Sequence, residues 1–409
     1  MKIGILAYQS AINFGANLQI ASTFGYLKNN GHDPRVINYI PEDLRQFYAS
    51  SKSEQADAHV GFINKYCTLT EECHNDEELA SVIIKEGIDS VIIGSDAVAQ
   101  HHPLLERIDF PTRNIINIRK LTSDRMFPNP FWGTFSDYLP QSFPMAILSA
   151  SNQDSSFKLM GNKTRKQMLS RLNKMRFISA RDTWTQAMYN YVFQGEKQIQ
   201  VTPDPVFAFN QNVLNQPSEA EIREKFGLKR DYFLLSFLDS KTVSLRWLTE
   251  FEQKAEDQGI ICVALPFPAG IKFKNALKHK INLPLSPMEW YCLIKYSKGY
   301  IGHNMHPIVV SLHNANPFFS FDNYGRRVRK HFVDESTSKI RHILTKADLL
   351  GYRSPCCNGN QVPPTPDYVL DRLLGFKKEI VETFSQQQTE AYNDTMNSIL
   401  QSLQKNITR

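Results

Sequence analysis

The stretch at residues 300–325 holds the side chains best suited to moving a proton. His303 and His306 lie in a short polar loop after an apolar run, and Pro307 suits the first turn of a following helix. An imidazole takes up or releases a proton near neutral pH, so His306 is the leading candidate for a general acid or base. The alternative is a structural histidine. His303 is the weaker candidate, and we interpret it first as a loop residue.

Charged side chains end two other apolar runs. Ser95 and Asp96 follow a strongly aliphatic run, where Asp96 could act as a base, accept a hydrogen bond from a sugar hydroxyl, or simply cap a helix. Arg181 ends a shorter run and carries the planar donor fork that binds a carboxylate or phosphate at two points. Its alternative role is a structural ion pair with Asp182 or Asp204.

Three amides flank the start of the first predicted helix. They are Asn13, Asn17 and Gln19. The free N–H groups of a helix N-terminus can hold an anion or orient a hydroxyl, and amides beside them can take part. Plain capping is the commoner role for any single asparagine at this place. The three amides are therefore candidates for contacts to a hydroxylated substrate, with capping as the alternative.

Positive charge is in mild excess, with 47 basic against 41 acidic side chains and a net charge of +6. This excess is too small to indicate nucleic-acid binding, and it suits an anionic small substrate or an anionic membrane surface. Part of it lies in the adjacent Arg326 and Arg327, which bind an anion or form a solvated face. A basic helix predicted at residues 162–174 has the same ambiguity, between a solvated face and a membrane-surface element.

Several common site signatures are absent from the sequence. It contains no GxGxxG, no GxxxxGK[ST] and no GxSxG, which argues against dinucleotide, P-loop and serine-hydrolase sites. The six cysteines form no CxxC pair, and Asp, His and Cys do not cluster at metal spacings, so we expect a site without metal. The N-terminus lacks a signal-peptide pattern, and no apolar run approaches the roughly 20 residues that span a bilayer, which predicts a cytoplasmic protein.

Alternating strands and helices must position these side chains. Residues 2–8, 16–30 and 36–40 are predicted as strand, helix and strand, the opening of a parallel doubly wound sheet. A linker rich in Asn, Gln and Pro at residues 210–218 precedes a second alternation of the same kind. The predicted fold is two α/β, Rossmann-like domains facing across a cleft, with a helical tail that crosses back over the first half. The expected units are residues 1–209, 210–375 and 376–409.

An irregular, proline-rich stretch interrupts the first half at residues 97–143. It includes the aromatic sequence FPNPFWGTF at residues 127–135. Long loops inside a domain are often substrate loops. The alternative is a surface insertion with a small hydrophobic patch of its own.

Five short motifs, taken in order along the chain, resemble the polysaccharide pyruvyl transferases. The sequences YQSAINFGANLQ, DSVIIGSD and ISARD are similar to the first three family motifs, and an Asp-Pro pair is similar to the fourth. The fifth is Asn304-Met305-His306, at the place of the family's R-x-H. Each motif is weak alone, and their order and spacing carry the resemblance. The matching positions are residues 8–19, 89–96, 178–182, 204–205 and 304–306.

The resemblance implies two Rossmann-like domains of glycosyltransferase-B type. It implies transfer of the pyruvyl group of phosphoenolpyruvate, without a further cofactor, onto two hydroxyls of one sugar as a cyclic ketal in surface or capsular polysaccharide synthesis. The acceptor in such pathways is often a lipid-linked saccharide, which is compatible with peripheral association at the inner face of the cytoplasmic membrane. Physically, the reaction needs a proton for the enol carbon, stabilisation of a cationic carbon centre and cationic donors for the departing phosphate.

Roles follow for individual positions of this sequence. The resemblance implies catalytic roles for His306 as general acid or base, for Arg181 as a clamp on the phosphate or carboxylate, and for Asp96, which with Asn13 would orient the sugar. The donor contacts that we expect are Arg181, Asn304, His303, Arg326, Arg327 and Lys339. The acceptor contacts that we expect are Asn13, Asn17, Gln19, Ser95 and Asp96.

The chain departs from the family pattern at two places. Asn304 stands where the family has an arginine, so Arg326, Arg327 or Lys339 would have to supply the missing charge. Ala97 follows Asp96 in place of the family's Gln-x-Trp-Asn sequence. These departures keep two alternatives open: a sugar-nucleotide-dependent glycosyltransferase of the same fold, and a non-catalytic relative that binds a saccharide. The first would use a glutamate on ribose, and none lies in residues 303–325.

Overall fold

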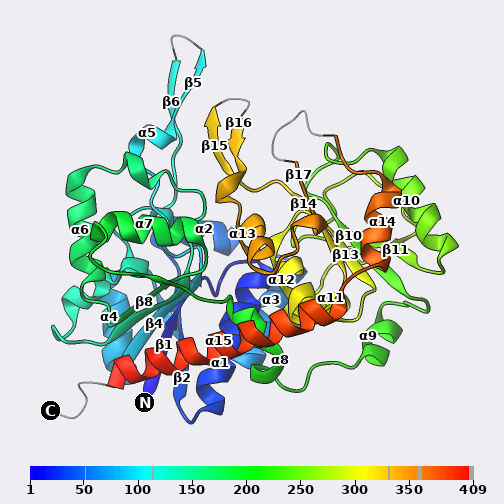
Figure 1. Ribbon diagram of the computed structural model, residues 1–409. Coiled ribbons are helices and arrows are strands. Elements are labelled where there is room, and N and C mark those ends of the chain that lie inside the picture. The colour runs from blue at the N-terminus through cyan, green and yellow to red at the C-terminus, as the bar shows by residue number, and fades with distance from the viewer. Residues whose placement is uncertain (51, 113–114, 330–331, 357–361, 405–409) are drawn as a thin grey trace.

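Two parallel β-sheets form the frame of the protein. The computed structural model describes residues 1–50, 52–112, 115–329, 332–356 and 362–404, and Figure 1 shows the sheets in its left and right halves. The first sheet runs β3 (Leu69–Cys73), β2 (Asp33–Tyr39), β1 (Lys2–Leu6), β4 (Ser90–Asp96), β7 (Met145–Ala150), β8 (Phe177–Ala180) and β9 (Gln200–Val201). The second runs β12 (His279–Lys280), β11 (Ile261–Ala264), β10 (Tyr232–Ser236), β13 (Gly299–Gly302), β14 (Phe318–Asp322) and β17 (Arg353–Pro355).

Neighbouring strands in both sheets are parallel, as the alternating sequence predicts. The central strands are aliphatic and buried on both faces, which is typical of parallel sheets covered by helices. Ile5 of β1 and Leu6 beside it are both fully buried and belong to different hydrophobic clusters, one on each face. The predicted α/β class is therefore confirmed. The domain boundary at residue 210 stays a prediction, in the stretch between β9 and β10.

Helices connect the strands. In the first half they are α1 (Phe14–Asn29), α2 (Glu42–Ser50), α3 (Glu54–Tyr66), α4 (Asp76–Glu86), α5 (Leu104–Arg107), α6 (Asn162–Leu172) and α7 (Thr183–Phe193). The passage between the sheets holds the short η5 (Pro205–Ala208), α8 (Phe209–Asn212) and α9 (Glu219–Lys225). The second half contains α10 (Leu245–Asp257), α11 (Pro287–Lys295), α12 (Met305–His313), α13 (Lys339–Lys346) and α14 (Pro366–Leu374), and α15 (Lys378–Gln404) follows.

One continuous hydrophobic cluster joins the two halves. It includes Leu18 of α1 and Val263 of β11, both fully buried. At the junction Phe14 stacks on Trp290 of α11, with ring centroids 5.1 Å apart and planes 12° from parallel. The Gln55 amide also exchanges two hydrogen bonds of 2.8 Å with the backbone of Leu285. The halves thus share a dry, hydrogen-bonded interface.

The C-terminal helix α15 runs back from the second half across the first, drawn in red along the lower edge of Figure 1. Tyr392 of α15 packs edge-on against Tyr26 of α1, with centroids 5.6 Å apart. Near its end, Arg176 of the first half donates a hydrogen bond of 2.9 Å to the carbonyl of Leu403. The predicted helical tail is therefore confirmed, and its contacts tie together both halves.

The proline-rich insertion of the first half has two parts with different environments. The hairpin of β5 (Ile108–Thr112) and β6 (Ile115–Ile118) projects away from the body (Figure 1). The aromatic segment at residues 127–135 is instead part of the main core, since Trp132 and Phe135 are 1% and 0% exposed. The aromatic rings fill space beside the first sheet, so this segment is not a separate surface patch. Lys120 and Arg125 of the same stretch line a cavity, and the substrate-loop interpretation stays a prediction.

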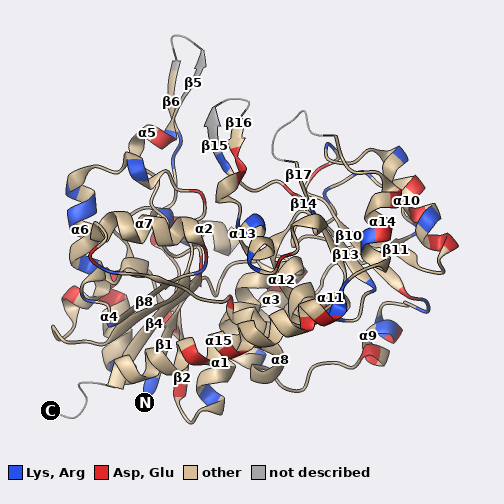
Figure 2. Cartoon of the chain, viewed as in Figure 1, with Lys and Arg blue, Asp and Glu red and all other residues tan. Residues whose placement is uncertain are grey.

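The basic helix expected at residues 162–174 corresponds to α6, on the left edge of Figure 2. Arg165 is buried and donates a hydrogen bond of 3.2 Å to the carbonyl of Val192. Arg171 and Lys174 both pair with Asp137, at 2.5 and 2.8 Å. These three cations interact with the protein itself, whereas Lys163 and Lys166 are exposed. The choice between a solvated face and a membrane-surface element therefore stays open.

No helix in the described ranges combines the length and the apolar character that crossing a bilayer requires.

Candidate active site

The carboxyl ends of the two sheets meet at a cavity of about 420 Å³, which we call the central cavity. Polar residues reach it from the end of β4, the loop after β8, the turn before α1, the loop after β13 and the start of α13. Those residues include several of the predicted site positions. They are Asn13, Asp96, Arg181, Asn304, His306 and Lys339, together with Asp154, Gln153 and Tyr324, which the sequence had not singled out.

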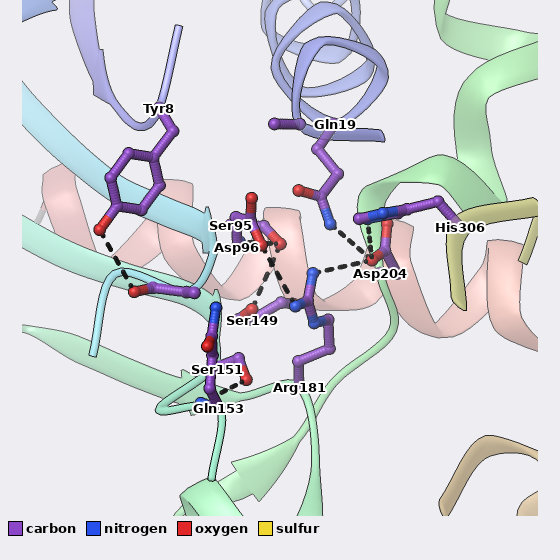
Figure 3. Close-up of polar contacts among 12 residues, drawn as sticks. Tyr8, Gln19, Ser95, Asp96, Ser149, Ser151, Gln153, Arg181, Asp204 and His306 are labelled. Carbon is purple, nitrogen blue, oxygen red and sulfur yellow. Dashed lines mark hydrogen bonds and ion pairs between the residues drawn. The ribbon is translucent and has the colours of Figure 1, made fainter. Parts of the chain in front are cut away.

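Arg181 lies at the centre of a buried charge network (Figure 3). Its side chain is 4% exposed, and it donates hydrogen bonds of 3.1 Å to Asp204 Oδ2 and 3.4 Å to Asp96 Oδ1. Asp204, 1% exposed at its side chain, also accepts from Gln19 Nε2 at 2.5 Å. Burial alone would lower the pKa of Arg181, and the two carboxylates raise it above its usual value. The guanidinium of Arg181 is therefore already paired with two carboxylates, and it is not an unpaired cation waiting to bind phosphate.

Asp96 is the carboxylate of this network that faces the central cavity. Burial raises its pKa, but Arg181, His306 and Lys339 together hold the pKa of Asp96 below its usual value. It is therefore ionised at neutral pH and can accept a hydrogen bond or a proton. Its backbone has a φ of +82°, in the left-handed region that side-chain-bearing residues seldom adopt. The end of β4 thus turns sharply to hold this carboxylate at the cavity.

His306 comes from the opposite half and meets the network across the cavity. Its Nε2 lies 3.9 Å from Asp204 Oδ2 and has no hydrogen-bond partner among the described residues. Burial lowers the pKa of His306, against the opposing effect of Asp204 and Asp96, so the imidazole is neutral at neutral pH. A neutral imidazole beside a carboxylate can accept a proton and be stabilised once charged.

The ring of His306 rests on the bare backbone of Gly15 in the first turn of α1. A Cβ atom at Gly15 would lie 2.1 Å from Cγ of His306, far inside van der Waals contact. Glycine is therefore needed there for the two halves to approach this closely. This contact also fixes the position of the imidazole relative to Asn13, which caps α1 by accepting a 3.2 Å hydrogen bond from Ala16 N.

Lys339 is the cation of the central cavity that remains available. It begins α13, and its ammonium group makes no hydrogen bond or ion pair with any described residue. Burial, reinforced by Arg181, lowers the pKa of Lys339 to about 8. It is thus charged at neutral pH and close enough to its pKa to lose that charge in mildly alkaline solution. Of the candidates to replace the arginine missing at Asn304 whose side chains are described, Lys339 lines the cavity and Arg326 does not.

The other two basic candidates lie elsewhere. Arg326 stacks on Trp184, with its guanidinium carbon 5.4 Å from the ring centroid, and lies 3.9 Å from Asp334 in the hairpin of β15 (Arg326–Arg329) and β16 (Phe332–Asp334). It is not among the residues that line the central cavity. The side chain of Arg327 lies outside the described residues.

Four further residues that we expected to contact a substrate are buried and do not line the central cavity. His303 is 1% exposed, accepts a hydrogen bond from Leu238 N and donates one to Thr242 Oγ1, both at 2.8 Å, and burial lowers its pKa to about 4. With both ring nitrogens engaged, it supports the loop instead of contacting a donor. Asn17, Gln19 and Ser95 are likewise buried, with hydrogen bonds to His59, Asp204 and the Ser149 carbonyl respectively.

Two other cavities adjoin the central one. The N-side cavity, about 480 Å³, lies in the first half and is lined by Tyr8, Tyr48, Gln100 and Arg125 among others. The C-side cavity, about 250 Å³, lies at the ends of β10 and β11. Asn13 lines all three cavities, so they adjoin one another at this side chain.

Among the described residues, no group of three or more His, Cys, Asp or Glu is placed to hold a metal ion. The sequence-based expectation of a metal-free reaction stays a prediction.

Asp204 is the principal site residue that sequence reasoning left without a role. It appeared there only in the fourth motif and as an alternative partner of Arg181. In the structure it contacts Gln19 and Arg181 and lies next to His306, and so links the first helix, the first sheet and the second half. The signal that could have found it is the motif itself, since an Asp-Pro pair at a strand end predicts a capping carboxylate. Its Oδ1 does accept a 3.0 Å hydrogen bond from Val206 N.

Comparisons with known proteins identify the family and the fold. A family model described as polysaccharide pyruvyl transferase matches residues 13–324. Among solved structures, the UDP-GlcNAc 2-epimerase from Neisseria meningitidis bound to UDP-GlcNAc has a TM-score of 0.53 and 10% identity over 99% of this chain and 100% of its own. Another UDP-N-acetylglucosamine 2-epimerase has a TM-score of 0.50 and 11% identity over 98% and 94%.

The glycosyltransferase SnogD from Streptomyces nogalater is also similar, with a TM-score of 0.48 and 10% identity over 98% and 99% of the two chains. No curated protein matched the chain in sequence. At these identities the epimerase structures show the fold alone, and they confirm the glycosyltransferase-B-like arrangement of two facing domains.

Proposed function

This chain belongs to the polysaccharide pyruvyl transferase family, and we propose that it transfers the pyruvyl group of phosphoenolpyruvate onto two hydroxyls of one sugar. The product is a cyclic ketal on a saccharide destined for a surface or capsular polysaccharide. The observation that carries the proposal is the grouping of an unpartnered imidazole, an ionised carboxylate and an available ammonium group around one cavity. These are His306, Asp96 and Lys339.

The first half of the reaction is an addition to the enol double bond. A proton joins the methylene carbon of phosphoenolpyruvate, a sugar hydroxyl oxygen bonds to the central carbon, and the hydroxyl proton leaves. In our proposal Asp96 accepts that hydroxyl proton. His306 supplies the proton to carbon, because the anionic donor bound beside it raises its pKa and charges the ring. Asp204, 3.9 Å from Nε2, stabilises the charged ring.

The second half expels phosphate. The bond between the central carbon and the phosphate oxygen breaks, and the second hydroxyl oxygen bonds to that carbon. Its proton passes to His306, which is neutral after the first half, and Asp96 returns the proton it accepted to the departing phosphate. Atoms balance as phosphoenolpyruvate plus diol giving ketal plus inorganic phosphate. Lys339 supplies the positive charge for the departing phosphate, a role the family arginine would fill at Asn304. The Asn304 side chain remains free to act as a neutral hydrogen-bonding group, since it makes no cap to α12.

Purified protein incubated with phosphoenolpyruvate and saccharide acceptors tests this proposal. The expected result is release of inorganic phosphate together with an acceptor product that carries the added mass of one pyruvyl ketal. Turnover of a UDP-sugar with none of phosphoenolpyruvate would instead establish the glycosyltransferase alternative. Saccharide binding with turnover of neither donor would establish the non-catalytic one.

The cellular setting is also part of the proposal. Phosphoenolpyruvate is a cytoplasmic metabolite, so we place the reaction in the cytoplasm, with no metal or further cofactor and no nucleic acid involved. A lipid-linked saccharide is the acceptor we expect, which would bring the protein to the inner face of the cytoplasmic membrane. Co-sedimentation with vesicles that carry a lipid-linked saccharide, compared with plain vesicles, tests this placement.

Donor capture should weaken as the pH rises through about 8. The lowered pKa means that Lys339 is protonated below this pH and neutral above it, so its contribution to kcat/KM for phosphoenolpyruvate should be present below about 8 and be lost above it, as an alkaline limb. Lys339→Arg, which keeps its charge, should abolish this alkaline limb. Lys339→Met should lower kcat/KM at pH 7 by about 10- to 100-fold, the worth of one charge-assisted hydrogen bond. An unchanged limb in Lys339→Arg would show that another group titrates.

Gly15→Ala should reduce turnover by about 10- to 100-fold, because the new methyl group displaces the His306 ring from its position. The fold should survive, since the ring is 18% exposed and can swing aside. Gly61→Ala is the matched control: it also replaces a helical glycine, but its Cβ would meet nothing within 4 Å. That control should gain about 0.5–1 kcal/mol of stability and keep full turnover. Equal activity in both variants would contradict the role of the Gly15 contact.

A further inference from the structure

The C-side cavity has walls that differ chemically from those of the central cavity. The turn after β11 lines it with Leu265, Pro266, Phe267 and Pro268 in succession, and Trp290 of α11 also lines it. Apart from His306, the described lining contains no charged or titrating group other than the phenol of Tyr324. A phosphate or diphosphate placed there would have no lysine or arginine to balance its charge. The cavity is therefore suited to a neutral ligand.

Phe267 is an aromatic side chain with no core to fill. It is half-buried and belongs to none of the hydrophobic clusters of the described chain. Its backbone is nevertheless fixed, because Phe267 and Gly270 exchange hydrogen bonds of 3.1 and 2.8 Å across a tight turn. An aromatic ring carried on a fixed turn at a cavity wall is the kind of surface on which the C–H face of a sugar packs.

The rim shared with the central cavity offers neutral hydrogen-bonding groups. Asn304 occupies the N-cap position of α12, yet its side chain makes no capping hydrogen bond. Asn13 uses its carbonyl oxygen as a cap, and its amide NH₂ has no hydrogen-bond partner among the described residues. Both residues line the central and the C-side cavities. Amides in this position suit the hydroxyls of a ring that lies next to the reacting sugar.

From these observations we propose that the C-side cavity is a subsite for a second, neutral sugar ring of the acceptor. Phe267 stacks on the face of this ring, and Asn13 and Asn304 bind its hydroxyls. The inference rests on the proposed function and extends it: the acceptor has at least two rings, with the sugar that receives the ketal in the central cavity. The enzyme therefore acts on an oligosaccharide in preference to a single sugar.

Binding and turnover are measured separately to test this subsite. Calorimetry on the full chain compares methyl β-galactoside with lactose, methyl β-glucoside with cellobiose, and methyl α-mannoside with α-mannobiose. For at least one pair the disaccharide should bind about 3- to 10-fold more tightly, the worth of one aromatic contact. Phe267→Ala should remove this preference without changing affinity for the methyl glycoside, and Phe267→Leu should remove most of it. Tyr138→Ala, an exposed aromatic outside the cavities, should keep it.

Different outcomes separate this inference from the proposed function. A Phe267-dependent preference for disaccharide in a protein that releases no phosphate from phosphoenolpyruvate would support the subsite and overturn the function. Equal affinity for both members of every pair, or a preference that survives Phe267→Ala, would overturn the subsite while phosphate release still supports the function. Tighter, Phe267-dependent binding of uridine, or affinity that grows with the length of an alkyl aglycone, would also overturn the subsite.

Discussion

His306→Gln should lower kcat for phosphate release from phosphoenolpyruvate by about 10²- to 10⁴-fold, the usual worth of a positioned acid–base group. Glutamine keeps a polar side chain of similar reach but cannot carry a proton. The Nε2 atom of His306 lies 3.9 Å from Asp204 and has no hydrogen-bond partner in the described part of the chain, so the substitution removes proton transfer with little cost to the fold. The effect should appear in kcat, with a smaller change in KM for phosphoenolpyruvate.

A matched histidine elsewhere controls for the substitution. His279 lies exposed on β12, at the edge of the second sheet, and His279→Gln should leave turnover unchanged. The pH profile provides a second check: His306 must be protonated to act as the acid, so the fall in kcat/KM as the pH rises through its lowered pKa should disappear in His306→Gln. Full activity in His306→Gln would remove the acid–base role from this residue, whatever the donor proves to be.

Arg181→Met should cost about 3–5 kcal/mol of unfolding free energy, measured by urea denaturation at pH 7. The substitution leaves the carboxylates of Asp96 and Asp204 buried without their cation, 3.4 and 3.1 Å from where it stood. Arg223→Met is the matched control, since Arg223 also pairs with two carboxylates, of Glu219 and Asp231, but at the surface. That variant should lose only about 0–1 kcal/mol.

The pH dependence of the Arg181→Met defect has a definite sign. In the native protein the pKa of Asp96 is lowered, so its ionised form stabilises the fold above its ordinary pKa, and this contribution is lost as the pH falls through the lowered value. Without Arg181, burial raises that pKa instead, and the defect should shrink as the pH is lowered. Adding Asp96→Asn should recover part of the loss at pH 7. A variant as stable as the native protein would contradict the network.

The strands and helices that carry most of the site could be predicted because they follow local rules. Asn13 begins α1 as a cap, β13 ends where the polar loop starts, and the Asp-Pro pair at Asp204 caps η5. Other elements could not be predicted from the sequence, because contacts with other parts of the chain determine whether they form. β3 has a largely polar sequence and pairs only because β2 offers an edge, and the basic run after Gly325 forms a hairpin with β16.

The positions of site residues could be predicted where a strand end determines them, but not where a partner distant in sequence does. Asp96 and His306 line the cavity as expected. Gln19 and Asp204 are 185 residues apart, so nothing local indicates that the amide serves a carboxylate instead of a substrate. His303 and His306 differ for a similar reason: the backbone turns into α12 between them, and one ring enters the wall while the other faces the cavity.

The path of α15 sets the order in which this protein can be completed during synthesis. Tyr26 donates a hydrogen bond of 2.9 Å to Asn397, 371 residues later, and it packs against Tyr392. At roughly 5–20 residues per second, roughly 20 to 75 s separate the translation of these two partners. During that interval the face of α1 that α15 later covers remains exposed on the nascent chain. If translation stalls within α15, this face of the first half stays uncovered.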